Sequence, residues 1–155
     1  MTKQIEDFAQ EYLDGQARQN ALDFIAFLRN HDFEFYKDCS GYWKDKIYYW
    51  VKLGEECLCF IAIKDPEEPE NLWTVWSDHS SVYEADIPEE DIKRTAFEHV
   101  DFCVHCCSCS DARQKIVFGR EFDNVCFCTF RVNNPDTRDL IFLKKMIELR
   151  KSVCP

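Results

Sequence analysis

Glycine is scarce in this chain, with four in 155 residues. The sequence has no G-x-x-x-x-G-K-[ST] phosphate-binding loop and no G-x-G-x-x-G dinucleotide motif. It also lacks the G-x-S-x-G motif that presents a nucleophilic serine at a sharp turn. Ser77, Asp78, His79 and Ser80 include the residue types of a hydrolase triad, but neighbours in a turn rarely point at one another, so we interpret them as a turn. We therefore predict a non-enzymatic protein.

Long apolar runs are missing as well. No stretch approaches the roughly eighteen apolar residues of a membrane span, and the first residues after Met1 have no apolar core of the signal-peptide kind. These absences predict a cytoplasmic protein that does not enter the membrane. Thiols stay reduced in that compartment, so the ten cysteines indicate ligands, reactive thiols or small buried side chains before they indicate disulfides.

Positive charge is the third deficit. The net charge is −10 at pH 7, and the acidic excess lies in the first hundred residues. Such acidity repels phosphate backbones, so we expect no nucleic-acid partner. The apolar share of 46% and the aromatic share of 15% predict a packed core. With no repeat or linker, residues 1–155 are expected to form a single domain.

The expected elements follow one another as helix, three or four strands, helix, cysteine-rich segment, strand and helix. Ile47 to Lys52 and Cys57 to Ile63 have the composition of a β-hairpin. Apolar residues at helical spacing before residue 30 predict two short helices, or one helix broken at Gly15. Runs of strands separated from helices indicate an α+β fold, with an antiparallel sheet of about four to five strands and the helices packed on one face.

Cysteine clustering is the most informative feature present. Six of the ten cysteines lie between Cys103 and Cys128. From Cys103 the spacing is C-x2-C-x2-C through Cys106 to Cys109, and sixteen residues then lead to Cys126. Two-residue gaps let successive thiolates turn back onto one tetrahedral ion. We predict a structural Zn²⁺ site with Cys103, Cys106, Cys109 and Cys126 as ligands.

Alternatives to this quartet remain open. Cys107, Cys128 and His105 are close enough in sequence to replace one of the ligands, or to act as reactive thiols in the case of the two cysteines. A [4Fe–4S] cluster is the rival cofactor, because C-x2-C-x2-C also begins bacterial ferredoxin ligation. Residues 99–130 are thus expected to be a metal-binding segment that resembles a zinc ribbon, with Lys115 to Phe118 as one short arm.

Tryptophan and tyrosine concentrate between residues 43 and 83. Aromatic side chains on adjacent strands usually form a core, but those with polar tips also line small-molecule pockets. Two interpretations stay open: these side chains belong to the core, or they form a groove for a small hydrophobic ligand. Its expected residues are Trp43, Tyr48, Trp50, Trp73, Trp76 and Tyr83.

The segment from His99 to Pro135 contains FCVHCCSC, IVFGREFDNVC, TFR and NNP, and DKIYYWV and LWTVWSD stand upstream. In these strings the chain resembles uncharacterised cysteine-rich bacterial proteins. The resemblance implies a bacterial cytoplasmic protein and the same cysteine quartet, and it brings no known activity. We interpret the chain as a small-molecule-binding or protein-interaction module with a structural zinc site. The alternative is a thiol-redox or metal-responsive protein that uses Cys107 and Cys128.

Overall fold

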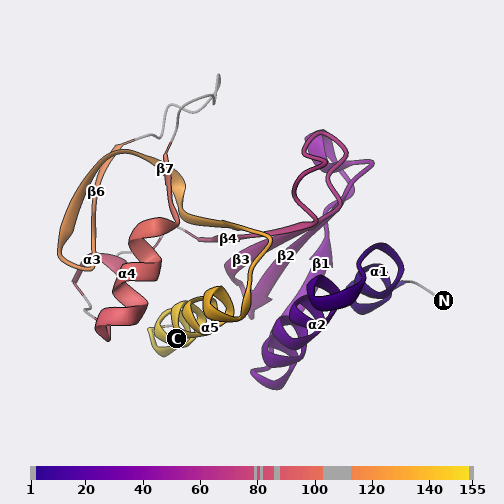
Figure 1. The fold of residues 1–155 in the computed structure, drawn as a ribbon, viewed down its shortest axis with the longest axis horizontal. Helices are drawn as coiled ribbons and strands as arrows, with labels where there is room; N and C mark the ends of the chain where they lie inside the picture. The colour runs from indigo at the N-terminus through magenta and orange to yellow at the C-terminus, as the bar shows by residue number, and fades with distance from the viewer. Residues whose placement is uncertain (1–2, 79, 81, 86–87, 103–112, 154–155) are drawn as a thin grey trace.

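The structure, a computed structural model, describes residues 3–78, 80, 82–85, 88–102 and 113–153 (Figure 1). It combines helices with an antiparallel sheet. The helices are α1 (Ile5–Tyr12), α2 (Gly15–Asn30), α3 (Val82–Ala85), α4 (Glu90–Glu98) and α5 (Thr137–Ser152), together with a 3-10 helix, η1 (Gly41–Trp43). The strands are β1 (Glu34–Lys37), β2 (Ile47–Leu53), β3 (Glu56–Ile63), β4 (Trp73–Ser77), β5 (Val100–Phe102), β6 (Arg113–Val117) and β7 (Arg120–Asn133).

The sheet is larger than the sequence predicted. Seven strands pair in the order β1-β2-β3-β4-β7-β5, and β6 also pairs with β7. The prediction of four to five strands was wrong, because β5 is only three residues long and follows α4 after a single residue, His99. Val100 continues the helical spacing of Ile92 and Ala96, so no break in the pattern marks β5 in the sequence.

The expected zinc-ribbon-like knot is not a feature of the fold as described. Lys115 to Val117 belongs to β6, which pairs with β7 as part of the main sheet and not as the arm of a separate unit. In the described ranges, no group of three or more His, Cys, Asp or Glu side chains could hold a metal ion. Residues 103–112, which carry most of the predicted ligands, lie outside the described part of the chain.

Local sequence signals account for where the helices begin. The first helical stretch is broken, and Gly15 starts α2 with a φ of +54°, a conformation that glycine adopts without steric cost. Asp136 caps α5, since its side chain accepts a hydrogen bond from the Asp139 amide at 2.8 Å, and the Asp139 side chain accepts one from the Asp136 amide. The start of α5 therefore follows from the type and spacing of these two residues.

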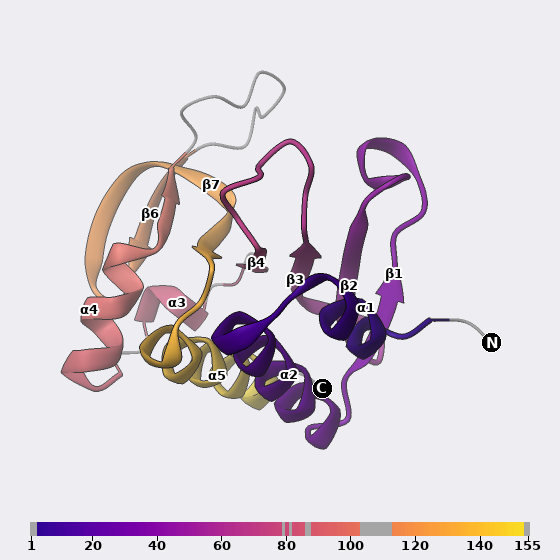
Figure 2. The ribbon, with the colours of Figure 1, turned by 45° about the vertical axis from the view of Figure 1, so that its right-hand side comes forward.

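One side of the sheet is covered by helices. Figures 1 and 2 show α1, α2 and α5 together below strands β1 to β4. The Phe24 ring of α2 lies 6.3 Å from the Trp73 ring of β4, and the Phe142 ring of α5 lies 5.2 Å from the Phe130 ring of β7. All four residues are buried in one continuous core. Burial of rings of this size supplies the main stabilisation of the layer.

The far end of the sheet is built on β7. This strand pairs with β4 near its carboxyl end and with β5 and β6 earlier along its length, so it joins two groups of strands. Phe118 and Gly119 have φ values of 46° and 82°, as a tight hairpin turn requires. The amide of Phe118 donates to the Tyr83 carbonyl at 2.6 Å, which fastens α3 to this hairpin. No described helix is long and apolar enough to cross a membrane.

Candidate functional site

A row of aromatic side chains crosses the side of the sheet that α1, α2 and α5 leave uncovered. Strand register places Tyr36 beside Trp50, Trp50 beside Phe60, Phe60 beside Trp76, and Trp76 beside Arg131. Because directly paired residues point to the same side of a sheet, these five share one face. Tyr36 is 48% exposed and Trp50 is 39% exposed, so part of the row lies in solvent.

Two further rings complete this surface. Trp43 of η1 stacks on Tyr48 of β2 with 4.0 Å between ring centroids and 7° between planes. Tyr48 in turn lies 6.0 Å from Phe60 and 5.9 Å from Trp76. Such contacts fix ring positions beyond what burial alone provides. We call the six rings the aromatic face; its members are Tyr36, Trp43, Tyr48, Trp50, Phe60 and Trp76.

Three cations lie against these rings. The Lys46 ammonium is 5.2 Å from the Trp43 ring centroid, and the Arg131 guanidinium is 5.1 Å from that of Trp76. Carboxylates neutralise both: Asp65 and Glu67 pair with Lys46, and Glu68 pairs with Arg131. These two cations therefore stabilise the surface and are not available to a ligand.

Lys52 is the third cation and differs from the other two. Its ammonium lies 5.3 Å from the Tyr36 ring centroid and 5.6 Å from that of Trp50. Among the described residues no hydrogen bond or ion pair engages it. Glu34 is its partner in the β1–β2 register, yet the Glu34 carboxylate accepts its hydrogen bond from the Tyr36 hydroxyl. Lys52 thus offers donors to an incoming acceptor.

The Trp50 ring is held in place by the chain after β1. Its Nε1 donates to Asp38 Oδ2 at 3.2 Å, while Asp38 Oδ1 accepts from the amide and the hydroxyl of Ser40 at 3.0 Å each. The Ser40 hydrogen bonds, and then that of Trp50, lower the pKa of Asp38, so the carboxylate is ionised and occupied. A pocket of about 250 Å³ lies here. It is lined by Tyr36, Lys37, Asp38, Cys39, Ser40, Trp50 and Lys52.

The structure gathers four of the six predicted groove residues. Trp43, Tyr48, Trp50 and Trp76 are members of the aromatic face. Trp73 and Tyr83 are fully buried in the core and cannot line a groove. Trp73 and Trp76 stand three positions apart on one strand, so period-two alternation sends them to opposite faces. That alternation was a signal available in the sequence.

Sequence reasoning missed three contributors to the site. Tyr36 is the register partner of Trp50, the Phe60 ring lies 5.6 Å from the Trp50 ring, and Lys52 supplies the accessible charge. Phe60 alternates with Cys59 and Ile61, which both face the helices, so its orientation could have been read from the pattern of β3. Lys52 stands two positions after Trp50 on β2, so the same alternation places it on that face.

The predicted metal ligands are only partly described. Cys103, Cys106 and Cys109 lie outside the described residues, as do the alternatives Cys107 and His105. Cys126 is half-buried on β7 and donates a hydrogen bond to the Asp101 carboxylate. Burial raises the pKa of Asp101, and the hydrogen bond from Cys126 acts against this increase. The zinc site and its [4Fe–4S] alternative therefore stay predictions from the sequence.

Metal content provides the test of that prediction. We expect one zinc per chain in the purified protein and none in Cys126→Ser, because loss of one of four thiolates opens a closed structural site. Cys57→Ser on β3 is the matched control and should keep the metal. The measurement is elemental analysis of both variants. Zinc that survives in Cys126→Ser but is lost in Cys128→Ser would assign the fourth ligand to Cys128 instead.

Three described thiols, those of Cys57, Cys59 and Cys128, have environments that suppress reactivity. Burial raises the pKa of Cys128 to about 12 and that of Cys57 to about 11. Burial also raises the pKa of Cys59 well above its ordinary value. The thiolate is the reactive form, so these side chains are inert near neutral pH. This counts against Cys128 as a redox group, whereas Cys107 lies outside the described residues.

The serine and aspartate that resemble part of a hydrolase triad have structural partners. The Ser77 hydroxyl accepts a hydrogen bond from the Phe130 amide and donates one to the Asp78 carbonyl, both at 3.1 Å. The Asp78 carboxylate accepts a hydrogen bond from Arg150 Nε at 2.6 Å. His79 lies outside the described residues. The arrangement binds β4 to β7 and α5, and both of these Ser77 hydroxyl hydrogen bonds go to backbone groups.

Comparison with protein-family models, with curated proteins and with solved structures found no match for the chain. The resemblance to uncharacterised cysteine-rich bacterial proteins stays a prediction from the sequence. Function is therefore argued from the geometry of the aromatic face.

Proposed function

We propose that this chain is a non-catalytic binding module that takes up a planar hydrophobic small molecule on its aromatic face. One observation carries the proposal: six aromatic side chains from η1 and four strands share a face that no described helix covers. Rings fixed in this way offer a preformed apolar surface with little loss of side-chain entropy on binding. The absence of catalytic motifs from the sequence favours binding over turnover.

The pocket beside Trp50 favours a small molecule over a protein partner. Its volume of about 250 Å³ suits one or two fused rings, somewhat below the usual range for drug-sized ligands. One wall is the Trp50 ring, already oriented by Asp38, and the Lys52 ammonium is the polar group that can fix a ligand's orientation. The ligand we propose is a planar hydrophobic compound that carries one hydrogen-bond acceptor.

We also place the protein in the cytoplasm. Cys39, Cys57, Cys59 and Cys128 are free thiols, which is the expected state in a reducing compartment. The structural zinc site predicted from the sequence belongs to this proposal as a stabilising element. A closed four-thiolate site has no open coordination position for substrate, so it adds no catalytic chemistry.

Trp50→Ala tests the site. We expect it to weaken binding of a planar compound such as an acceptor-bearing naphthalene by about tenfold or more, since one stacked ring contributes roughly 1–3 kcal/mol. Stability should change little, because the ring is partly in solvent. Tyr12→Ala, an exposed aromatic on α1, is the matched control and should bind as the parent does. The readout is intrinsic fluorescence titrated with a panel of such compounds.

Lys52→Met separates the two parts of the site. It should weaken the binding of compounds that carry an acceptor and leave the binding of their acceptor-free analogues unchanged, because only compounds with an acceptor use the ammonium. Equal loss for both classes would show that Lys52 acts through packing on Trp50. Absence of saturable binding by any planar compound would remove the proposed function.

A further inference from the structure

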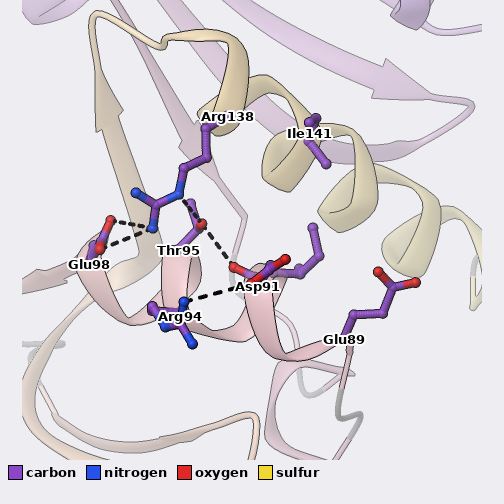
Figure 3. A pocket seen from close by; sticks show the side chains of 8 residues that line it. Glu89, Asp91, Arg94, Thr95, Glu98, Arg138 and Ile141 are labelled. Atoms are coloured by element: carbon purple, nitrogen blue, oxygen red, sulfur yellow. Dashed lines mark hydrogen bonds and ion pairs between the residues drawn. The ribbon is translucent and has the colours of Figure 1, made fainter.

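A second hollow surface lies between α4 and α5, away from the aromatic face. One part has a volume of about 500 Å³, and a second part of about 350 Å³ shares Glu89, Ile92 and Ile141 with it. The two parts therefore form one groove, which we call the α4/α5 groove. Figure 3 shows Ile141 reaching from α5 over the space between the helices, with charged side chains around it.

The α5 wall of the groove is a helical stripe. Arg138, Ile141, Lys145 and Glu148 line it, and their spacing of three, four and three residues keeps them on one side of the helix. At 1.5 Å per residue the stripe is about 15 Å long. Ile141 is 58% exposed, although it lies in the middle of the stripe, and Ile92 of α4 faces the same space.

Charge is segregated between the two walls. The α4 side supplies Glu89, Asp91 and Glu98, and its one base, Arg94, pairs with Asp91 at 3.7 Å. The α5 side supplies Arg138, Lys144 and Lys145, with Glu148 as its one acid at the far end. The Lys144 ammonium pairs with Asp23 of α2 at 2.7 Å, so Lys145 is the base of this wall that is open to a partner. The groove thus has a mainly acidic wall, a mainly basic wall and an apolar centre.

One end of the groove is already closed by its own side chains. Arg138 donates to both carboxylate oxygens of Glu98 at 3.1 Å and to the Thr95 hydroxyl at 3.0 Å, as the dashed lines in Figure 3 indicate. The other end is different, because within the described residues the side chains of Glu89, Lys145 and Glu148 make no hydrogen bond or ion pair. The end near Lys145 is therefore the one that can pair with a partner.

We propose that the α4/α5 groove binds an amphipathic helix of a partner protein, with apolar side chains on Ile92 and Ile141, bases toward α4 and acids toward α5. A stripe of about 15 Å matches roughly three turns of helix. The opposed charges on the two walls specify a helix whose two flanks carry opposite signs. The net charge of −10 opposes a second copy of the chain as the occupant. This site is independent of the small-molecule site on the aromatic face.

Three synthetic helical peptides with the same apolar stripe provide the test. One carries bases on one flank and acids on the other, one carries bases on both flanks, and one carries acids on both. Exchanging the two flanks of the mixed peptide is not a control, because reversing the helix direction restores the match. The full-length protein should bind the mixed peptide about tenfold more tightly than either other peptide, measured by fluorescence anisotropy at physiological salt to limit nonspecific attraction to basic peptide.

Two variants place the binding in the groove. Ile141→Glu should weaken binding of the mixed peptide about tenfold or more. Tyr12→Glu, which adds the same charge to α1, should leave that binding unchanged. Lys145→Glu should weaken binding of the mixed peptide and strengthen binding of the all-basic one, since it removes the base of the α5 wall that is open to a partner and adds an acid beside Glu148. Equal binding by the parent and Ile141→Glu, or no binding of any peptide, would overturn the proposal. Dimers of the parent in sedimentation that Ile141→Glu abolishes would also overturn it, because the occupant would then be a second copy.

Discussion

Arg150→Met should destabilise the protein by about 3–5 kcal/mol at neutral pH. Arg150 Nε lies 2.6 Å from Asp78 Oδ2, and both side chains are almost fully buried. Removal of one member of a buried ion pair leaves the other charge uncompensated, which costs far more than the pair itself contributes. The measurement is the free energy of unfolding from urea denaturation.

The stability lost in Arg150→Met should depend on pH in a defined direction. Burial raises the pKa of Asp78 to about 6, although Arg150 acts to lower it, so the pKa in the variant must be higher still. The unfolded chain ionises this carboxyl near its ordinary value of 3.8. A carboxyl whose pKa is higher in the folded state than in the unfolded state lowers the free energy of unfolding as pH rises between those two values. The difference between variant and parent should therefore be largest at pH 7 and shrink toward pH 4.

Arg94→Met is the matched control for this effect. Arg94 pairs with Asp91 at 3.7 Å on the surface of α4, where solvent screens the charges. Exposed pairs contribute roughly 0–1 kcal/mol, so this variant should unfold much as the parent does at every pH. A similar loss in both variants, or a deficit for Arg150→Met that does not change with pH, would contradict the role assigned to the buried pair.

Phe130→Ala should also cost about 3–5 kcal/mol, through a cavity in the core. Phe130 is fully buried on β7, and its ring lies 5.1 Å from Tyr83 and 5.2 Å from Phe142. It thereby joins α3, the sheet and α5, so its removal withdraws contacts from all three. Urea denaturation again provides the measurement.

Tyr12→Ala provides the comparison for Phe130→Ala. Tyr12 is also aromatic, but it is exposed on α1 and packs mainly on Phe8, so its loss should cost about 1 kcal/mol or less. If Phe130→Ala proved as mild as Tyr12→Ala, β7 would not be the strand on which the core depends.

Much of the fold could be predicted because its local signals agree with its packing. The hairpin of β2 and β3 and the cap of α5 at Asp136 follow directly from residue type and spacing. The number of strands could not be predicted in the same way. β5 is too short to show a period, and β7 pairs with three different strands, which only the tertiary structure determines.

The site was predictable where it depends on composition and alternation, and unpredictable where it depends on contacts between side chains. The concentration of aromatic residues indicated a surface between residues 43 and 83, and strict alternation would have removed Trp73 from it. Alternation also places Lys52 on the face of Trp50, but it does not show that Glu34 accepts a hydrogen bond from Tyr36 and not from Lys52. The contribution of Trp43 depends on how η1 folds back onto Tyr48. Neither of these contacts leaves a pattern in the sequence.

The central claim is that the aromatic face binds a planar ligand, and the four tryptophan indole N–H signals in a two-dimensional NMR spectrum test it most directly. Trp43, Trp50 and Trp76 belong to the face, while Trp73 is buried beneath the helices and serves as an internal control. Titration with an acceptor-bearing planar compound should shift the Trp50 signal most, Trp43 and Trp76 less, and Trp73 scarcely at all. Equal shifts of all four signals, or a shift confined to Trp73, would contradict the account.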